Sequence, residues 1–128
     1  MTKPLGVAIL GCGLIGQKRS KALANTKLVV CADVNETRAK ALASGFPNCF
    51  GTSDWRMAAQ RDDVDIVIVA TTNDSLVEAS LAAVNAGKHV LVEKPAARNV
   101  KELDILTEAV NKQGVQVRVG FNHRYHPA

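Results

Sequence analysis

The 128-residue sequence has few aromatic residues and no long hydrophobic run. Phe, Trp and Tyr together make up 4% of it, so rings on which nucleic-acid bases could stack are scarce. Its longest stretch without a polar side chain is residues 5–16, which contains four glycines. A membrane helix needs about 20 apolar residues, so no membrane span is predicted.

Cysteine is also scarce. Cys12, Cys31 and Cys49 lie 19 and 18 residues apart, and no Cys-x-x-Cys pair occurs. An odd number at this spacing argues against a disulfide framework and against a zinc site, so we expect no bound metal. We expect reduced, mostly buried thiols and a cytoplasmic location. The first residues do not have the pattern of a secretory signal, so we expect none.

The charge balance is mildly basic, with 16 Lys and Arg against 12 Asp and Glu and a formal net charge of +4. The only tight basic group is Lys18, Arg19 and Lys21, and the other cations are mixed with acids. This pattern favours solvated helix faces over nucleic-acid binding. Apolar residues at 47% and charged residues at 22% are typical of a globular protein, and the length fits one domain.

Short apolar runs alternate with helical patterns, which is typical of βαβ units and a parallel sheet. The predicted strands cover residues 5–10, 27–32, 48–50, 66–70, 89–92 and 115–119. The predicted helices cover residues 13–25, 35–44, 53–60, 75–87 and 99–114. We therefore predict a three-layer α/β Rossmann fold, a doubly wound parallel sheet in the order 3-2-1-4-5-6.

The predicted domain covers residues 1–120, and residues 121–128 are predicted to begin a crossover to a second domain.

Several helix starts carry capping residues. Asn35, Ser53 and Asn99 are candidate N-caps, and Ser75 with Glu78 resembles a capping box.

A glycine-rich sequence, Gly-Cys-Gly-Leu-Ile-Gly at residues 11–16, follows the first strand and opens the first helix. In such a loop the first glycine makes the tight turn, the second lets the backbone approach a pyrophosphate, and the third lets helix and strand pack closely. The helix N–H groups and dipole then hold the phosphates. The predicted cofactor-binding residues of this loop are Gly11, Gly13, Leu14, Ile15 and Gly16.

Asp33 ends the second strand, 22 residues after Gly11. A carboxylate there accepts hydrogen bonds from the adenosine ribose and repels a 2′-phosphate, which favours NAD over NADP. Arg38 lies one turn further on and leaves NADP as the alternative, unless it is only a solvated helix charge. A methyltransferase that uses S-adenosylmethionine has a similar loop and acid, so it is also an alternative at this point.

Further polar residues follow the fourth and fifth strands. Thr71, Thr72 and Asn73 stand where ribose or nicotinamide groups bind in such folds, although they could simply cap the next helix. Lys94 follows Glu93 and precedes a proline. Its ammonium could bind a substrate oxygen, or move a proton if desolvation lowered its pKa. The alternative is a surface lysine paired with Glu93.

Together these residues resemble the glucose-fructose oxidoreductase/inositol dehydrogenase/MocA-like family over essentially the whole chain. The resemblance is carried by the glycine loop, Asp33, Asp-Ile-Val-Ile-Val-Ala-Thr at 65–71, Ala-Gly-Lys-His-Val at 86–90 with Glu-Lys-Pro at 93–95, and Gly-Phe-Asn-His-Arg-Tyr at 120–125. It implies NAD(P)-dependent oxidation or reduction of a sugar, polyol or related hydroxy compound, and it argues against the methyltransferase.

The resemblance also implies residue roles. Lys94 matches the family's active-site lysine near the nicotinamide, Glu93 a residue near the nicotinamide ribose, and Thr71 and Asn73 the cofactor-contacting turn. Two positions depart from the family pattern, since Thr72 replaces a proline and Leu76 replaces a histidine.

The family's second domain, which carries substrate specificity and further catalytic residues, has no counterpart in this sequence. His123 and His126 fall in the expected crossover segment and outside the family's catalytic motif. We therefore expect this chain to bind NAD without turning over substrate. Apolar surface left exposed could make it a homo-oligomer. A stand-alone NAD-binding module that senses or scaffolds is the alternative.

Overall fold

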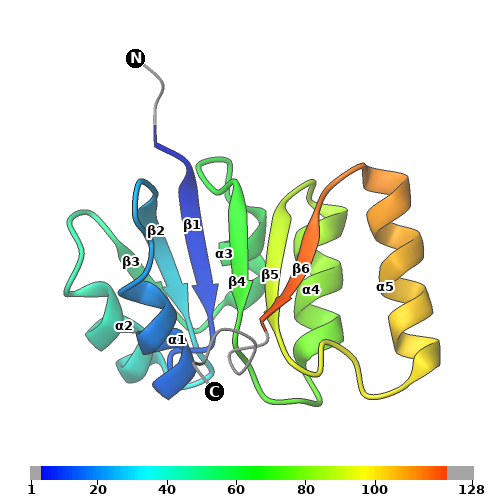
Figure 1. Cartoon of the computed structure of the whole chain (residues 1–128). Coiled ribbons are helices and arrows are strands. Elements are labelled where there is room, and N and C mark those ends of the chain that lie inside the picture. Colours follow the sequence, from blue (N-terminus) through cyan, green and yellow to red (C-terminus); the bar gives the residue numbers. More distant parts are fainter. Residues whose placement is uncertain (1–3, 121–128) are drawn as a thin grey trace, which may run out of the picture.

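A computed structural model of the chain describes residues 4–120. They form one six-stranded sheet in the order β3-β2-β1-β4-β5-β6, and each pair of neighbouring strands is parallel (Figure 1). The predicted doubly wound Rossmann fold is confirmed. The predicted crossover segment, with His123 and His126, lies outside the described residues.

The strands alternate with five helices along the chain. The strands are β1 (Gly6–Leu10), β2 (Lys27–Ala32), β3 (Phe50–Thr52), β4 (Ile66–Val69), β5 (His89–Glu93) and β6 (Val117–Gly120). The helices are α1 (Leu14–Ser20), α2 (Glu36–Ala43), α3 (Trp55–Gln60), α4 (Leu76–Asn85) and α5 (Val100–Gln113). No helix of residues 4–120 is long and apolar enough to cross a membrane.

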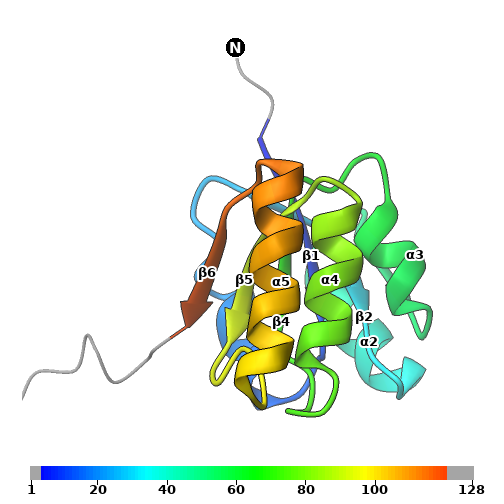
Figure 2. The ribbon, with the colours of Figure 1, turned by 90° about the vertical axis from the view of Figure 1, so that its right-hand side faces the viewer.

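Helices cover both faces of the sheet, which gives the predicted three layers (Figure 1). On one face α1 and α2 lie over the strands, and the core there includes Ile9, Cys31 and Ala39. On the other face α3, α4 and α5 lie side by side, as Figure 2 shows, over a larger core that includes Leu10 and Val67. Every residue of β1 is buried because it lies between both helix layers.

Two predicted elements differ clearly from the structure, whereas the bounds of the others shift by at most two residues. The first helix ends at Ser20, five residues early, because the chain turns back through Ala24, which has a φ of 44°. The hydroxyl of Thr26 donates to the Leu23 carbonyl at 2.6 Å within this turn. The third strand begins at Phe50, where the prediction ended, because Asn48 has a φ of 58° and cannot lie in a strand.

The capping predictions were partly wrong. Asn35 and Asn99 do cap α2 and α5, since their side chains accept from the backbone N–H of Arg38 and Glu102. Asp54, however, caps α3 in place of Ser53, because its carboxylate reaches the N–H of Met57. Ser75 precedes α4 but makes no side-chain cap. Its expected partner Glu78 pairs with Arg56, so no capping box forms.

Candidate functional site

The loops that carry the predicted site residues meet at one edge of the sheet. Because all six strands run in the same direction, their carboxyl ends lie together, at the lower edge in Figure 1. The order of the strands reverses between β1 and β4, and such a switch point is where α/β sheets bind ligands. The glycine loop after β1, Asp33 after β2 and Thr71 after β4 all belong to this edge.

Two glycines of the loop are required by the fold. Gly11 has a φ of 97°, and a Cβ on it would lie 2.4 Å from the Ala70 carbonyl oxygen. A Cβ on Gly16 would lie 2.0 Å from the Gly11 carbonyl oxygen. These residues therefore let α1 and the loop after β4 approach the end of β1, as the third-glycine role predicts.

Gly13 has no such reason to be glycine. It precedes α1 with an ordinary φ of −78°, and a Cβ on it would meet no atom within 4 Å. Neither backbone strain nor packing among the described residues excludes a side chain here. A ligand that approaches the backbone closely does account for the glycine, and a pyrophosphate at a helix N-terminus is such a ligand.

Asp33 holds the glycine loop to the loop after β2. Its Oδ2 accepts from the backbone N–H of Cys12 at 2.7 Å, and its Oδ1 accepts from the N–H of Asn35 at 2.8 Å. An ionised carboxylate has about four acceptor sites, so each oxygen keeps one for a ligand hydroxyl. The residue is half-buried beside a cavity that it helps to line.

This cavity has a volume of about 410 Å³. Its lining brings together Gly11, Gly13, Asp33, Arg38, Thr71 and Thr72 from the predicted site, and adds Ala32, Val34, Trp55, Arg56, Ala70, Ser75, Glu78 and Ala79. Half of the predicted cofactor-binding residues therefore share one hollow, although they come from loops up to about sixty residues apart in sequence.

The two threonines after β4 have different surroundings. The Thr71 hydroxyl is buried and has no hydrogen-bond partner among residues 4–120, so a bound group could supply one. The Thr72 hydroxyl already donates to the Asp74 carboxylate at 2.5 Å, and this bond lowers the pKa of Asp74. Thr71 is the better candidate for ligand contact.

The other predicted residues lie outside the cavity. Leu14 and Ile15 are exposed at the start of α1, Gly16 is buried beneath the loop, and Asn73 is exposed in the turn after β4. Exposed apolar side chains beside a phosphate loop are free to contact a ligand lying across it. Their contribution to binding stays a prediction.

The end of β5 carries Glu93 and Lys94. Glu93 is buried, and its carboxylate forms a two-point ion pair with Arg19 of α1, at 2.7 and 3.1 Å. The role of Glu93 near the nicotinamide ribose stays a prediction, and its carboxylate already pairs with Arg19. Lys94 is exposed at the same edge, just after the strand. The Glu93 carboxylate pairs with Arg19 and not, as the alternative suggested, with Lys94.

Trp55, Arg56 and Glu78 form a cavity wall that sequence reasoning missed. The Arg56 guanidinium lies 4.4 Å from the centre of the Trp55 ring and pairs with Glu78 of α4. A flat, polar-edged wall of this kind suits an aromatic base. The signal was available, because α3 begins just after β3, whose carboxyl end lies at the same edge as the glycine loop.

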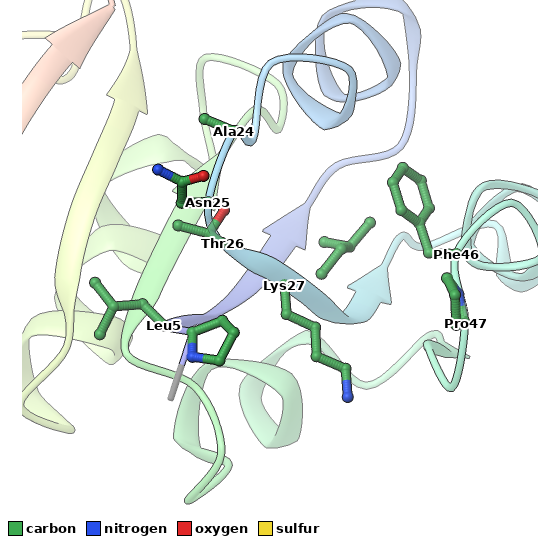
Figure 3. Close-up of a pocket in the computed structure, with 9 residues that line it drawn as sticks. Leu5, Ala24, Asn25, Thr26, Lys27, Phe46 and Pro47 are labelled. Atoms are coloured by element: carbon green, nitrogen blue, oxygen red, sulfur yellow. The ribbon is translucent and has the colours of Figure 1, made fainter. Parts of the chain in front are cut away.

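A second, more open hollow of about 1000 Å³ lies at the opposite edge, by the amino ends of β1 and β2 (Figure 3). It is lined by Pro4, Leu5, Ala24, Asn25, Thr26, Lys27, Leu28, Phe46 and Pro47. Lys27 is the one ionisable side chain in this lining. The hollow therefore has no acidic side chain that could act together with the lysine. Within residues 4–120 no group of three His, Cys, Asp or Glu could hold a metal ion either.

Comparison with known proteins agrees with this geometry. The family model described as an oxidoreductase family with an NAD-binding Rossmann fold, the glucose-fructose oxidoreductase/inositol dehydrogenase/MocA family, matches residues 5–121. The chain belongs to this family. The resemblance noted from the motifs is thereby confirmed, and with it the assignment of the chain as an NAD-binding domain.

Individual relatives are similar over most of this chain. Levoglucosan dehydrogenase of Pseudarthrobacter phenanthrenivorans is 33% identical over 97% of the chain and 35% of its own length. Inositol 2-dehydrogenase of Mycolicibacterium smegmatis is 35% identical over 96% of the chain and 37% of its own length. Among solved structures, that of GenD2 from gentamicin A biosynthesis, in complex with NAD, matches with a TM-score of 0.90 and 30% sequence identity. The match covers 99% of this chain and 37% of GenD2. The chain thus spans little more than a third of these relatives.

Proposed function

We propose that this chain is the cofactor-binding part of a dehydrogenase that exchanges hydride between NAD(H) and a sugar, polyol or related hydroxy compound. The observation that carries the proposal is Gly13, whose missing side chain leaves the backbone at the start of α1 open to a ligand. The printed names of the relatives, which include levoglucosan and inositol dehydrogenases, support the substrate class. The free thiols fit a reducing compartment such as the cytoplasm.

The residues present fit the parts of the dinucleotide. The backbone around Gly13 would hold the pyrophosphate, and the open lone pairs of Asp33 would accept from the adenosine ribose. The adenine would enter the cavity against the wall formed by Trp55 and Arg56. The hydroxyl of Thr71, which has no hydrogen-bond partner among residues 4–120, lies on the way from Asp33 toward the end of β5. When bound, NAD supplies the hydride acceptor.

Lys94 is the residue to which we assign the proton step. It follows β5, two strands away from the glycine loop along the carboxyl edge, where the nicotinamide end of the dinucleotide would lie. As a neutral amine it would accept the proton that the substrate hydroxyl loses on oxidation, and the ammonium so formed would hydrogen-bond the carbonyl oxygen of the product. Arg19 keeps the neighbouring carboxylate of Glu93 occupied, which leaves Lys94 available for substrate.

We further propose that the site prefers NAD to NADP. A 2′-phosphate would stand against the Asp33 carboxylate, whose two oxygens are held in place by backbone N–H groups. Arg38 lines the same cavity, and it is the cation that would favour NADP if it outweighed the carboxylate.

Calorimetric titration of the chain with NAD and NADP tests both statements. At a hundredfold excess over Kd, a ligand that binds only the folded state adds about 2.7 kcal/mol to the free energy of unfolding, so thermal unfolding provides a second reading. We expect NAD to bind at least tenfold more tightly than NADP. Asp33→Asn should weaken NAD binding by about ten- to hundredfold, since a hydrogen bond to a charged group contributes about 1.5–3 kcal/mol.

Asp62→Asn, an equal change at an exposed aspartate, is the matched control and should bind NAD as the parent chain does. Binding of neither dinucleotide would contradict the cofactor assignment. Preferential binding of NADP would leave that assignment standing and show that Arg38, not Asp33, decides the choice.

A further inference from the structure

The three cysteines, far apart in sequence, lie close together in the fold. Cys12 follows β1, Cys31 lies in β2, and Cys49 immediately precedes β3, and these three strands are neighbours in the sheet. All three side chains pack in the core on the side of α1 and α2. The Sγ atoms of Cys31 and Cys49 are 3.8 Å apart.

The two thiols of this pair have unlike surroundings. Cys31 is fully buried, whereas Cys49 is only partly buried and so open to small solutes. Arg61, whose guanidinium lies 6.0 Å from the ring of the adjacent Phe50, places positive charge near Cys49, although it is shared with Asp63. The Cys31 thiol and this cation lower the pKa of Cys49, while contact with the other two thiols and burial raise that of Cys31.

We propose that Cys31 and Cys49 are a redox-active thiol pair, which hydrogen peroxide converts to a reversible disulfide joining β2 to the start of β3. Such a bond has an S–S distance of about 2.05 Å, so the sulfurs must approach by somewhat under 2 Å. Cys49 precedes the first paired residue of β3, and its backbone is therefore not held in the sheet on both sides. The proposal does not depend on the cofactor assignment.

The chemistry balances with peroxide as the oxidant. The thiolate of Cys49 attacks one peroxide oxygen, the O–O bond breaks, and hydroxide leaves, giving a sulfenic acid at Cys49. The sulfur of Cys31 then attacks the sulfenic sulfur, forms the S–S bond and expels the sulfenic oxygen. The protons of the Cys31 thiol and of the medium convert the released oxygens to water, so two thiols and one peroxide give one disulfide and two waters. A small dithiol reverses the reaction by exchange.

Cys12 is the competing partner for Cys31, and its geometry is less suitable. Its thiol donates to the Ala32 carbonyl at 3.4 Å, and it has no exposed surface. A peroxide molecule therefore reaches Cys49 first. This makes Cys12→Ser a matched control, because it removes one of the three thiols without removing the pair.

The test is treatment of the 128-residue chain with hydrogen peroxide, followed by thiol counting in denaturant and mapping of peptides without reduction. We expect free thiols to fall from three to one, a crosslink between Cys31 and Cys49, and recovery with dithiothreitol. The Cys12→Ser chain should fall from two thiols to none, with the same crosslink. In Cys31→Ser, dimedone should label Cys49 as a sulfenic acid.

Three outcomes would overturn the proposal. They are a thiol count that stays at three, a crosslink between Cys12 and Cys31, and oxidation of Cys49 to sulfinic acid with Cys31 still free. If Cys31→Ser fails to fold, Cys49→Ser at the partly exposed position serves in its place. That variant should keep both remaining thiols under the same treatment, and their loss would equally contradict the assignment.

Discussion

Replacing each of two glycines in the same loop by alanine should separate folding from cofactor binding. Gly13→Ala adds a methyl group where no protein atom lies within 4 Å and where φ is an ordinary −78°. Gly16→Ala adds the same group 2.0 Å from the Gly11 carbonyl oxygen. The first change should spare the fold and impair NAD binding, whereas the second should damage the fold itself.

The magnitudes follow from the two environments. For Gly13→Ala, reduced freedom of the unfolded chain stabilises by about 0.4–1 kcal/mol, and the poorer helix cap costs a similar amount, so the unfolding free energy should change by less than about 1 kcal/mol. For Gly16→Ala, α1 must move away from β1, and overpacking of this kind costs about 1–3 kcal/mol. Loss of a phosphate hydrogen bond at Gly13 costs about 1.5–3 kcal/mol, a ten- to hundredfold weaker Kd.

Urea unfolding and calorimetric titration with NAD, performed on the parent chain and both variants, measure these effects. The reasoning fails if Gly13→Ala binds NAD with the parent affinity, because the open backbone would then not be a phosphate site. It fails equally if Gly13→Ala loses as much stability as Gly16→Ala, because the space beside Gly13 would then be needed by the protein.

Two further predictions concern the end of β5. In our proposal Lys94 lies near the nicotinamide, which carries a positive charge when it is oxidised. Lys94→Ala should therefore improve the affinity for NAD relative to NADH by about threefold, the effect of two charges about 6 Å apart in water. If the ratio of the two affinities stays the same after the change, Lys94 lies away from the ring. Glu93→Gln should lower the unfolding free energy by about 1.5–3 kcal/mol, because the half-buried Arg19 loses a charged partner. A urea midpoint equal to that of the parent chain would show that the ion pair makes no net contribution to stability.

Local pattern was enough to predict the sheet order, because most of the strands are short apolar runs and helices alternate with them along the chain. Such βαβ units have one handedness, which leaves few ways to arrange six of them. Prediction failed where tertiary context decided the outcome. Glu78 has the spacing of a capping box with Ser75, but Arg56 lies close enough across α3 and α4 to take the carboxylate.

The site was predictable to the extent that a residue's role depends on its place at the end of a strand. Gly11, Asp33 and Thr71 all follow strands and meet at one cavity. The wall formed by Trp55 and Arg56 was missed although α3 begins just after β3, because the pairing of Arg56 with Glu78 of α4 joins residues that are not neighbours in sequence. The same limit explains Glu93, since its pairing with Arg19 joins two motifs that are 74 residues apart.

Asp33 shows why the unliganded loop is already in a shape to bind. A carboxylate that only met the ribose would leave the glycine loop free to move before the cofactor arrives. Here the same carboxylate accepts from the N–H of Cys12, inside the loop, and from that of Asn35, which itself caps α2. Each additional acceptor bond fixes the carboxylate more firmly, so in the proposed complex the ribose would meet oxygens whose positions are set by two backbone segments. On this proposal, affinity for NAD would depend on the loop's conformation as much as on the charge of Asp33.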